Sequence, residues 1–452
     1  MPQFLLSFWQ KYRHHLRETT FLSIPVIVGQ LGMTMMGVID NLMIGKLGVI
    51  PLSAASLANA DLIIFSVIGL GIAFAISPLV AAAKGAKDNV LVGGYFRHGM
   101  WVGLGTGVAL GGIIWASIYV LPHMGQPVQD LALATSYLKI LSLSVLPYML
   151  FLTAKQFVDG LSLTVPAMLI TLIGLATNVF GNWLLIYGNA GFPKLGLDGA
   201  GYATLFSRVL MMVMMLVYVL FRPQFRRYGV LKDWRLFDMS LVRKILSIGF
   251  PSGLQYFFEV GAFAGAVVMV GWLEDGSINR SAHQIVIQLA AITYMLVAGL
   301  SAGAAIRVGE AFGQRDIKSV RLAGMAGIYL AVILMIVASI ILIMGRDFFP
   351  ALFVSDTKVL KLASGLMVIA GLFQLFDGIQ AVGIGILRGI QDVKIPTLLA
   401  FIIYWLVALP LGYIFGFTLG GGLEGIWYSL VVSLFLASVV LTWRFWRLTQ
   451  NK

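Results

Sequence analysis

The sequence contains no cysteine, and only 11% of its 452 residues are charged. Disulfides, thiolate metal sites and cysteine nucleophiles are therefore excluded. Its five histidines show no HExxH or other ligand spacing, so we expect no transition-metal site. No P-loop spacing and no clustered nucleophile and base occur either, which argues against an enzyme and against an organic cofactor.

Hydrophobic residues make up 59% of the chain, and the mean hydropathy is +0.93. Soluble domains average about 45 to 50% apolar and about 25% charged residues, so the composition predicts a polytopic protein of the lipid bilayer. A helix needs about 20 apolar residues to cross a bilayer. The runs long enough to do so predict twelve helices, at 20–45, 53–82, 99–121, 132–159, 166–188, 199–221, 245–273, 282–308, 322–345, 359–387, 396–418 and 425–446.

Lysine and arginine exceed the acidic residues by 31 to 19, a net charge of +12. These basic residues gather in alternate loops, which indicates that both termini and the 222–244 loop are cytoplasmic. The arginines are expected in loops, so the basic excess needs no nucleic acid or other anionic partner. The first 20 residues lack the features of a signal peptide, so we expect the first span to be retained in the membrane.

The polar stretch 222–244 divides the chain into an amino-terminal lobe, 1–221, and a carboxy-terminal lobe, 245–452. The segment 71–88 superposes without gaps on 299–316 at a shift of 228 residues. Further matches keep shifts between 226 and 230: Pro25 with Pro251, Gly160 with Gly389, Pro166 with Pro396, and GLDG (196–199) with GLEG (422–425). The predicted fold class is therefore an all-α integral membrane protein with two six-helix bundles related by a parallel pseudo-two-fold repeat, which rock around a midplane site.

Two carboxylates interrupt apolar spans of the second half. Glu259 lies in the middle of the run 250–273, where a charge costs roughly 2.5 to 3.5 kcal/mol on insertion scales. Asp377 lies near the middle of the tenth run, with Gln374 and Gln380 three residues to either side and roughly on one helix face. Such acids are either protonated structural residues or a site for a monovalent cation or a shared proton.

The first half carries Asp40 within its first span, and Asn178 and Asn182 four residues apart on one face of the fifth. With Thr204, these side chains supply the hard oxygen ligands or proton partners that a small cation needs. The alternative is that the two asparagines only hold helices together. Asp61 either faces water at the outer mouth or contacts substrate.

These residues and their surroundings resemble the multidrug and toxin extrusion (MATE) family, and its NorM-like bacterial branch. The matching motifs are GVIDNLMIG, NVFGNWLLIYG, FFEVGAF, AHQI followed by IRVGEAFGQ, GIGILRGIQD and YWLVALPLGY. The resemblance implies twelve helices in two lobes with a V-shaped central cavity. It also implies antiport, the export of organic cations and drugs in exchange for Na⁺ or H⁺ as the coupling ion, by a protein that we expect to be a monomer.

The resemblance assigns Glu259 and Asp377 to a carboxy-lobe cation site. It assigns Asp40, Asn178, Asn182 and Thr204 to an amino-lobe cation or proton site. The substrate cavity is expected to include Asp61, His283, Phe373, Gln374 and Gln380. Phe373 departs from the family pattern, which has a tyrosine there, and this puts Na⁺ coordination in the carboxy lobe in doubt. Archaeal-type members often carry an acid at the position of Asn182. A flippase for lipid-linked precursors is the alternative, but it is expected to line its cavity with arginines.

Overall fold

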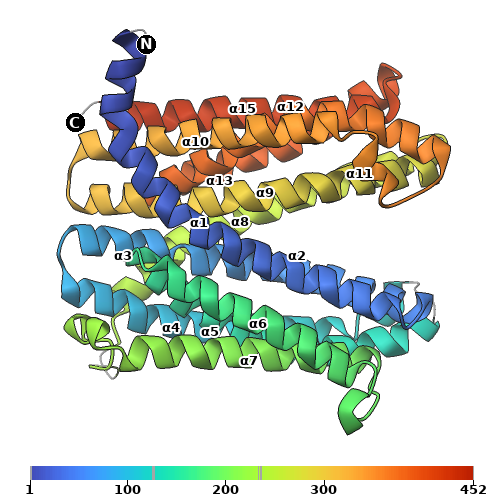
Figure 1. The fold of residues 1–452 in the computed structure, drawn as a ribbon, viewed down its shortest axis with the longest axis horizontal. Coiled ribbons are helices and arrows are strands. Elements are labelled where there is room, and N and C mark those ends of the chain that lie inside the picture. The colour runs from blue at the N-terminus through green and yellow to red at the C-terminus, as the bar shows by residue number, and fades with distance from the viewer. Residues whose placement is uncertain (1–2, 125–127, 233, 235–236, 451–452) are drawn as a thin grey trace. The chain divides into compact units, whose positions relative to one another are not determined.

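The computed structural model describes residues 3–124, 128–232, 234 and 237–450. Within these residues there are no strands, and twelve helices are long and apolar enough to cross a membrane, as predicted. Figure 1 shows these helices as long coiled ribbons. In order they are α1 (Gln3–Gly45), α2 (Val49–Phe74) continued by α3 (Ile76–Gly85), α4 (Asn89–Ser117), α5 (Val128–Gly160), α6 (Thr164–Leu185), α7 (Leu197–Phe221), α8 (Met239–Gly271), α9 (Gly276–Gly313), α10 (Ile317–Met344), α12 (Thr357–Gly389), the segment Lys394–Thr418, and α15 (Gly422–Gln450).

Several helices exceed the predicted spans because hydropathy detects only their apolar part. The first span was expected at 20–45, whereas α1 begins at Gln3. The eleventh span is the least regular. It consists of α13 (Lys394–Phe401), the π-helix η4 (Ile402–Ala408), α14 (Leu409–Tyr413) and a second π-helix, η5 (Ile414–Thr418). Short elements fill the connections: η1 (Leu121–Met124), η2 (Asn189–Gly191), η3 (Pro223–Tyr228) and α11 (Phe348–Ala351).

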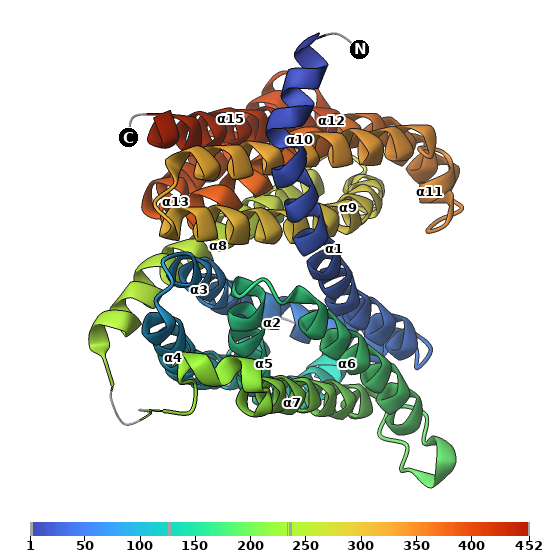
Figure 2. The ribbon, with the colours of Figure 1, turned by 60° about the vertical axis from the view of Figure 1, so that its left-hand side comes forward.

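The chain folds as two compact units, Val28–Leu254 and Met1–Ile27 with Gln255–Lys452. The central helix of the first unit is α5, which packs on α7, α4 and α2. The central helix of the second is α12, which packs on α9, α15 and α10. Figure 2 shows α10, α12 and α15 together in the second unit. The two central helices are related by the repeat, and both end at a glycine, Gly160 and Gly389.

The repeat extends to backbone detail. Asp88 and Asp316 cap the equivalent helices α4 and α10 through their side chains, and each follows a residue with a φ of 59°. A Cβ atom on Gly160 would lie 2.6 Å from the backbone oxygen of Ser77, and one on Gly389 would lie 2.9 Å from that of Ala305. Both glycines therefore permit the same close helix contact, at positions that keep the sequence shift.

The polar 222–244 segment is not a free linker in its described part. Arg97 of α4 donates a hydrogen bond to the backbone oxygen of Gly229 (2.7 Å), and the Nε2 atom of His98 accepts one from the backbone N–H of Asp238 (2.8 Å). Gly93 also lies against Tyr228, where a Cβ atom would meet a backbone oxygen at 1.9 Å. The segment is thus fastened along α4.

Candidate functional site

The first group of predicted residues meets in the unit Val28–Leu254, and we call it the Asp40 cluster: Asp40 of α1, Asn178 and Asn182 of α6, and Thr204 of α7. Asn182 donates a hydrogen bond to Asp40 Oδ1 (2.5 Å), and Thr204 donates one to Asp40 Oδ2 (3.2 Å). Asn178 donates to the Thr204 hydroxyl (3.3 Å), and Asn182 also lies 3.4 Å from the carboxamide oxygen of Asn178. Three helices therefore converge on one carboxylate.

All four side chains of the Asp40 cluster are buried, and Asp40 retains 7% exposure. The carboxamide oxygen of Asn182 is buried and has no hydrogen-bond partner among the described residues. That oxygen belongs to the side chain that also donates to Asp40, so the cluster has one hydrogen-bond acceptor that accepts no hydrogen bond. A proton or a small cation is what such a set of oxygen atoms can receive.

The second group lies in the other unit, and we call it the Glu259/Asp377 cluster. Glu259 of α8 and Asp377 of α12 are 6% and 3% exposed. Their charges interact with each other, and the Gln380 amide is a polar neighbour of Glu259. None of the ion pairs found among the described residues involves either carboxylate, so no arginine or lysine neutralises them directly.

Two tyrosines complete the surroundings of this cluster, and sequence reasoning did not assign them to the site. Tyr294 of α9 and Tyr404 of the π-helix η4 both interact electrostatically with Glu259 and Asp377. Tyr404 is 1% exposed, and its hydroxyl has no hydrogen-bond partner among the described residues. The sequence did indicate Tyr404, because it is the first residue of the YWLVALPLGY motif and a tyrosine buried in a span usually needs a polar partner. These hydroxyls stand near the acids although position 373 is a phenylalanine.

Buried oxygen atoms without partners are concentrated in this cluster. Within the described residues, no hydrogen bond reaches Glu259 Oε2, Gln380 Oε1, the Tyr404 hydroxyl or Gln374 Oε1. Gln374 uses only its amide nitrogen, which donates to the backbone oxygen of Ala290 (3.1 Å). Unpaired buried polar groups cost roughly 1 to 3 kcal/mol each and call for an explanation. A site that holds a cation through oxygen atoms would explain them together.

Phe373 and His283, predicted for the substrate cavity, lie in an aromatic group in the core of their unit. The ring of Phe373 lies 5.7 Å from that of Trp427 and 5.9 Å from that of Phe263. The Trp427 indole N–H donates to Nδ1 of His283 (3.1 Å). Both residues are at most 2% exposed, so neighbouring side chains cover them in this conformation.

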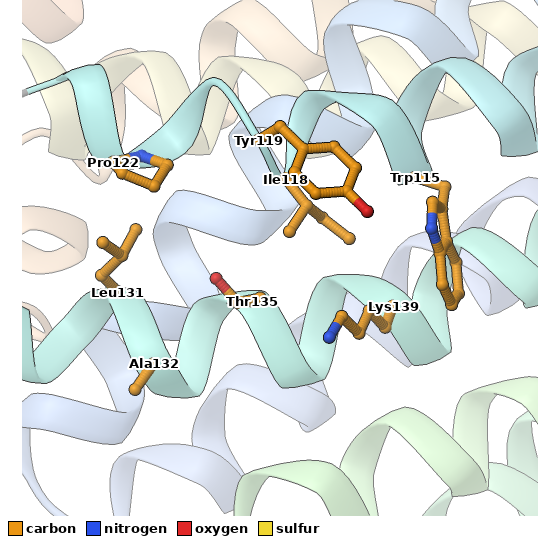
Figure 3. Close-up of a pocket in the computed structure, with 8 residues that line it drawn as sticks. All are labelled: Trp115, Ile118, Tyr119, Pro122, Leu131, Ala132, Thr135 and Lys139. Carbon is orange, nitrogen blue, oxygen red and sulfur yellow. The ribbon is translucent and has the colours of Figure 1, made fainter.

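Asp61 lies apart from both clusters. It is half-buried and accepts a hydrogen bond from the hydroxyl of Ser117 (2.6 Å) at the end of α4. Beside that end is a pocket of about 490 Å³ between α4, η1 and α5 (Figure 3). Trp115, Tyr119 and Lys139 are among its lining residues, and none of the predicted site residues is.

Sequence reasoning also missed a half-buried arginine inside a membrane-spanning helix. The arginines were expected in loops, but Arg208 lies in the middle of α7, because the strongly apolar residues around it mask its charge in a hydropathy scan. It donates to the Ser144 hydroxyl (2.7 Å) and lies over the ring of Tyr148. A buried ion pair, between Lys155 and Asp159 (2.6 Å), lies near the end of α5.

A membrane-embedded helical protein with two repeated units, each containing polar residues buried at span depth, has the build of a secondary transporter. The MatE family profile matches residues 25–184 and 251–414, and the chain belongs to this family. The probable multidrug resistance protein NorM of Rhizobium meliloti is 34% identical over 97% of this chain and 94% of its own length. The multidrug resistance protein NorM of Photobacterium profundum is 33% identical over 96% and 95%.

Solved structures share the fold. The eukaryotic MATE transporter AtDTX14 superposes with a TM-score of 0.87 at 22% identity, over 96% of both chains. An outward-facing multidrug resistance MATE family transporter superposes with a TM-score of 0.88 at 20% identity, over 97% of both chains. The predicted family and fold class are confirmed.

Proposed function

We propose that the chain is an antiporter that exports organic cations and drugs in exchange for Na⁺ or H⁺ by alternating access. The names of the relatives, which are multidrug resistance proteins, support export of varied small molecules. The Glu259/Asp377 cluster supports the cation coupling. It combines two carboxylates with buried oxygen atoms that have no partner, at a depth where charge is otherwise avoided.

The proposed exchange follows from competition for negative charge. Glu259 and Asp377 attract a monovalent cation or a proton, and a cationic drug competes for the same charges. Gln380, Gln374 and Tyr404 supply neutral oxygen atoms that replace part of the lost hydration. Each occupant favours a different arrangement of the lobes 1–221 and 245–452, which couples the downhill ion to the uphill drug.

The Asp40 cluster is proposed as a second cation or proton site. Its residues share one carboxylate, and the hydrogen bonds from Asn182 and Thr204 stabilise that carboxylate when it is charged. We propose that the protein is a monomer in a bacterial inner membrane. Both termini are placed in the cytoplasm, because the basic residues gather in alternate loops. We propose that substrate contacts Asp61, Phe373 and His283 in another conformation of the protein.

The test is transport of a fluorescent organic cation by the purified protein in proteoliposomes, with a Na⁺ gradient and a pH gradient imposed separately. We expect at least one gradient to drive uptake against the substrate gradient, and Glu259→Gln to abolish it. Glu310→Gln is the matched control, because Glu310 pairs with Arg307 (3.8 Å) near the end of α9, away from the cluster. Equal transport with and without either gradient would refute the proposal.

A flippase for lipid-linked precursors is the weaker candidate. It would require a row of positive charge for a pyrophosphate, and Arg208 is a single guanidinium that is occupied by Ser144 and Tyr148. Movement of a pyrophosphate-linked lipid between leaflets, with no export of organic cations, would favour it over the antiporter.

A further inference from the structure

Arg208 lies in the middle of a helix that is long and apolar enough to span a membrane. It is near the centre of α7 (Leu197–Phe221), about 16 Å from the first residue of that helix at 1.5 Å per residue. Arginine keeps its charge in proteins, and a charge at this depth is costly, so intramembrane arginines are rare and usually functional. Among the described residues, no carboxylate forms an ion pair with Arg208.

The guanidinium is held in place by neutral groups of α5. One of its terminal nitrogens donates to the Ser144 hydroxyl (2.7 Å), and its Cζ atom lies 4.7 Å from the ring centroid of Tyr148. Its Nε atom is buried and has no hydrogen-bond partner among the described residues. These contacts fix the position of the charge without cancelling it.

The uncancelled charge lies beside the Asp40 cluster. Thr204, which donates to Asp40, is four residues before Arg208 and therefore on the same face of α7. Asp40 and Arg208 interact electrostatically, and Tyr137 of α5 interacts with both. The groups around the carboxylate are thus the Arg208 cation and the Thr204 hydroxyl from α7, the Tyr137 hydroxyl from α5 and two neutral carboxamides from α6.

We infer that Arg208 is a specificity-determining residue that excludes Na⁺ from the Asp40 cluster while leaving the cluster open to a proton. Na⁺ must give up its hydration and depends on net negative charge to replace it, and an ionised Asp40 beside Arg208 has a net charge of zero. A proton forms a covalent bond to the carboxylate and needs no set of ligands. This inference rests on the proposed function and divides the ions between its two clusters.

The Glu259/Asp377 cluster differs in this respect. Its two carboxylates carry a charge of −2 when both are ionised, and the arginine of its central helix, Arg388, lies eleven residues beyond Asp377. Arg388 lies 5.6 Å from the ring of Tyr256, three residues before Glu259 on α8, and its single charge can offset at most one of the two carboxylates. This cluster therefore keeps the net negative charge that a metal cation requires.

Binding of radioactive Na⁺ to the purified full-length protein tests the inference. The background variant is E259Q/D377N, which leaves Asp40 as the only acid of the two clusters. We expect no saturable Na⁺ binding in this background. Adding Arg208→Met should create a Na⁺ site, with affinity higher by a factor on the order of 10 to 50 for removal of a charge roughly 7 to 10 Å away at an effective dielectric constant of about 20. Adding Asp40→Asn should abolish that site.

Two controls separate charge from structure. Arg208→Lys keeps the charge and should bind no Na⁺, whereas Lys139→Met removes a positive charge from the α5 pocket and should also create no site. Asp40-dependent Na⁺ binding with Arg208 in place would overturn the inference, and so would its absence in a folded Arg208→Met variant. If the Arg208→Met variant does not fold, Na⁺ binding by the E259Q/D377N background, which keeps Arg208 and Asp40, decides the question. Failure of the proposed function would appear separately, as loss of ion-driven transport by the unmodified protein.

Discussion

Removing one charge from the Glu259/Asp377 cluster should weaken cation binding by about two orders of magnitude. Glu259→Gln keeps the size of a side chain that is 6% exposed, so the packing around it should persist. Loss of one carboxylate about 4 Å from a monovalent cation costs about 4 kcal/mol at an effective dielectric constant of 20. The amide oxygen of the glutamine remains as a neutral ligand and returns roughly 1 to 2 kcal/mol. The net loss of about 2 to 3 kcal/mol corresponds to a decrease in affinity of about 30- to 150-fold.

The measurement is the concentration of Na⁺, and separately the pH, at which a bound fluorescent organic cation is displaced from the detergent-purified protein. In Glu259→Gln and in Asp377→Asn, the displacement curve of the coupling ion should shift to higher ion concentration by that factor. Thermal unfolding of both variants should stay within a few degrees of the unmodified protein. Displacement curves that coincide with those of the unmodified protein would refute the assignment of the ion site to these two acids.

Three further changes test particular contacts. Tyr404→Phe removes a hydroxyl without a partner, so we expect unchanged thermal stability and a roughly five- to tenfold loss of cation affinity in the same displacement assay; equal affinity would contradict its role as a ligand. Gly160→Ala places a methyl group 2.6 Å from a backbone oxygen of α3 and should lower the free energy of unfolding by about 1 to 3 kcal/mol. The control is Gly105→Ala, which has nothing within 4 Å of the added methyl group and should be neutral or slightly stabilising. Equal melting temperatures of the two variants would contradict the close contact at Gly160. Asp316→Ala removes the cap of α10 and should cost about 1 kcal/mol at neutral pH. Hydrogen bonds from the side chain and backbone of Ser319 lower the pKa of Asp316, so this difference should shrink as the pH falls below about 4; a constant difference in melting temperature would argue against the cap.

The fold could be predicted from the sequence because its determinants are repetitive. Twelve apolar runs of span length predict helices, because a helix forms all of its backbone hydrogen bonds within itself, as lipid requires. The repeat was predicted from the matches of 71–88 with 299–316 and of Gly160 with Gly389. The structure reproduces this repeat in its backbone angles and in its close helix contacts. Helix ends were less predictable, because α1 extends well before its apolar part and hydropathy does not detect such extensions.

Grouping of the candidate residues could be predicted in part. Asp40, Asn178, Asn182 and Thr204 were expected together, and their hydrogen bonds unite them. Tyr404 was missed because it is contributed by a different helix, and only the tertiary packing brings its hydroxyl near the acids. Helix periodicity can group residues of one helix but does not specify how one helix faces another.

The repeat also shows how one scaffold can acquire two chemistries. In the register that aligns Gly160 of α5 with Gly389 of α12, Tyr148 corresponds to Asp377 and Ser144 to Phe373. The positions that hold Arg208 in one unit therefore supply Asp377, a proposed ion ligand, and the ring of Phe373 in the other.

In the inferred scheme the two units differ in side-chain charge: it is close to zero for Asp40 with Arg208, and −2 for Glu259 with Asp377 when these groups are ionised. Two sites of equal charge would compete for the same ion. Sites of unequal charge can take different ions, and a transporter built in this way can respond to pH in one unit and to a cation in the other.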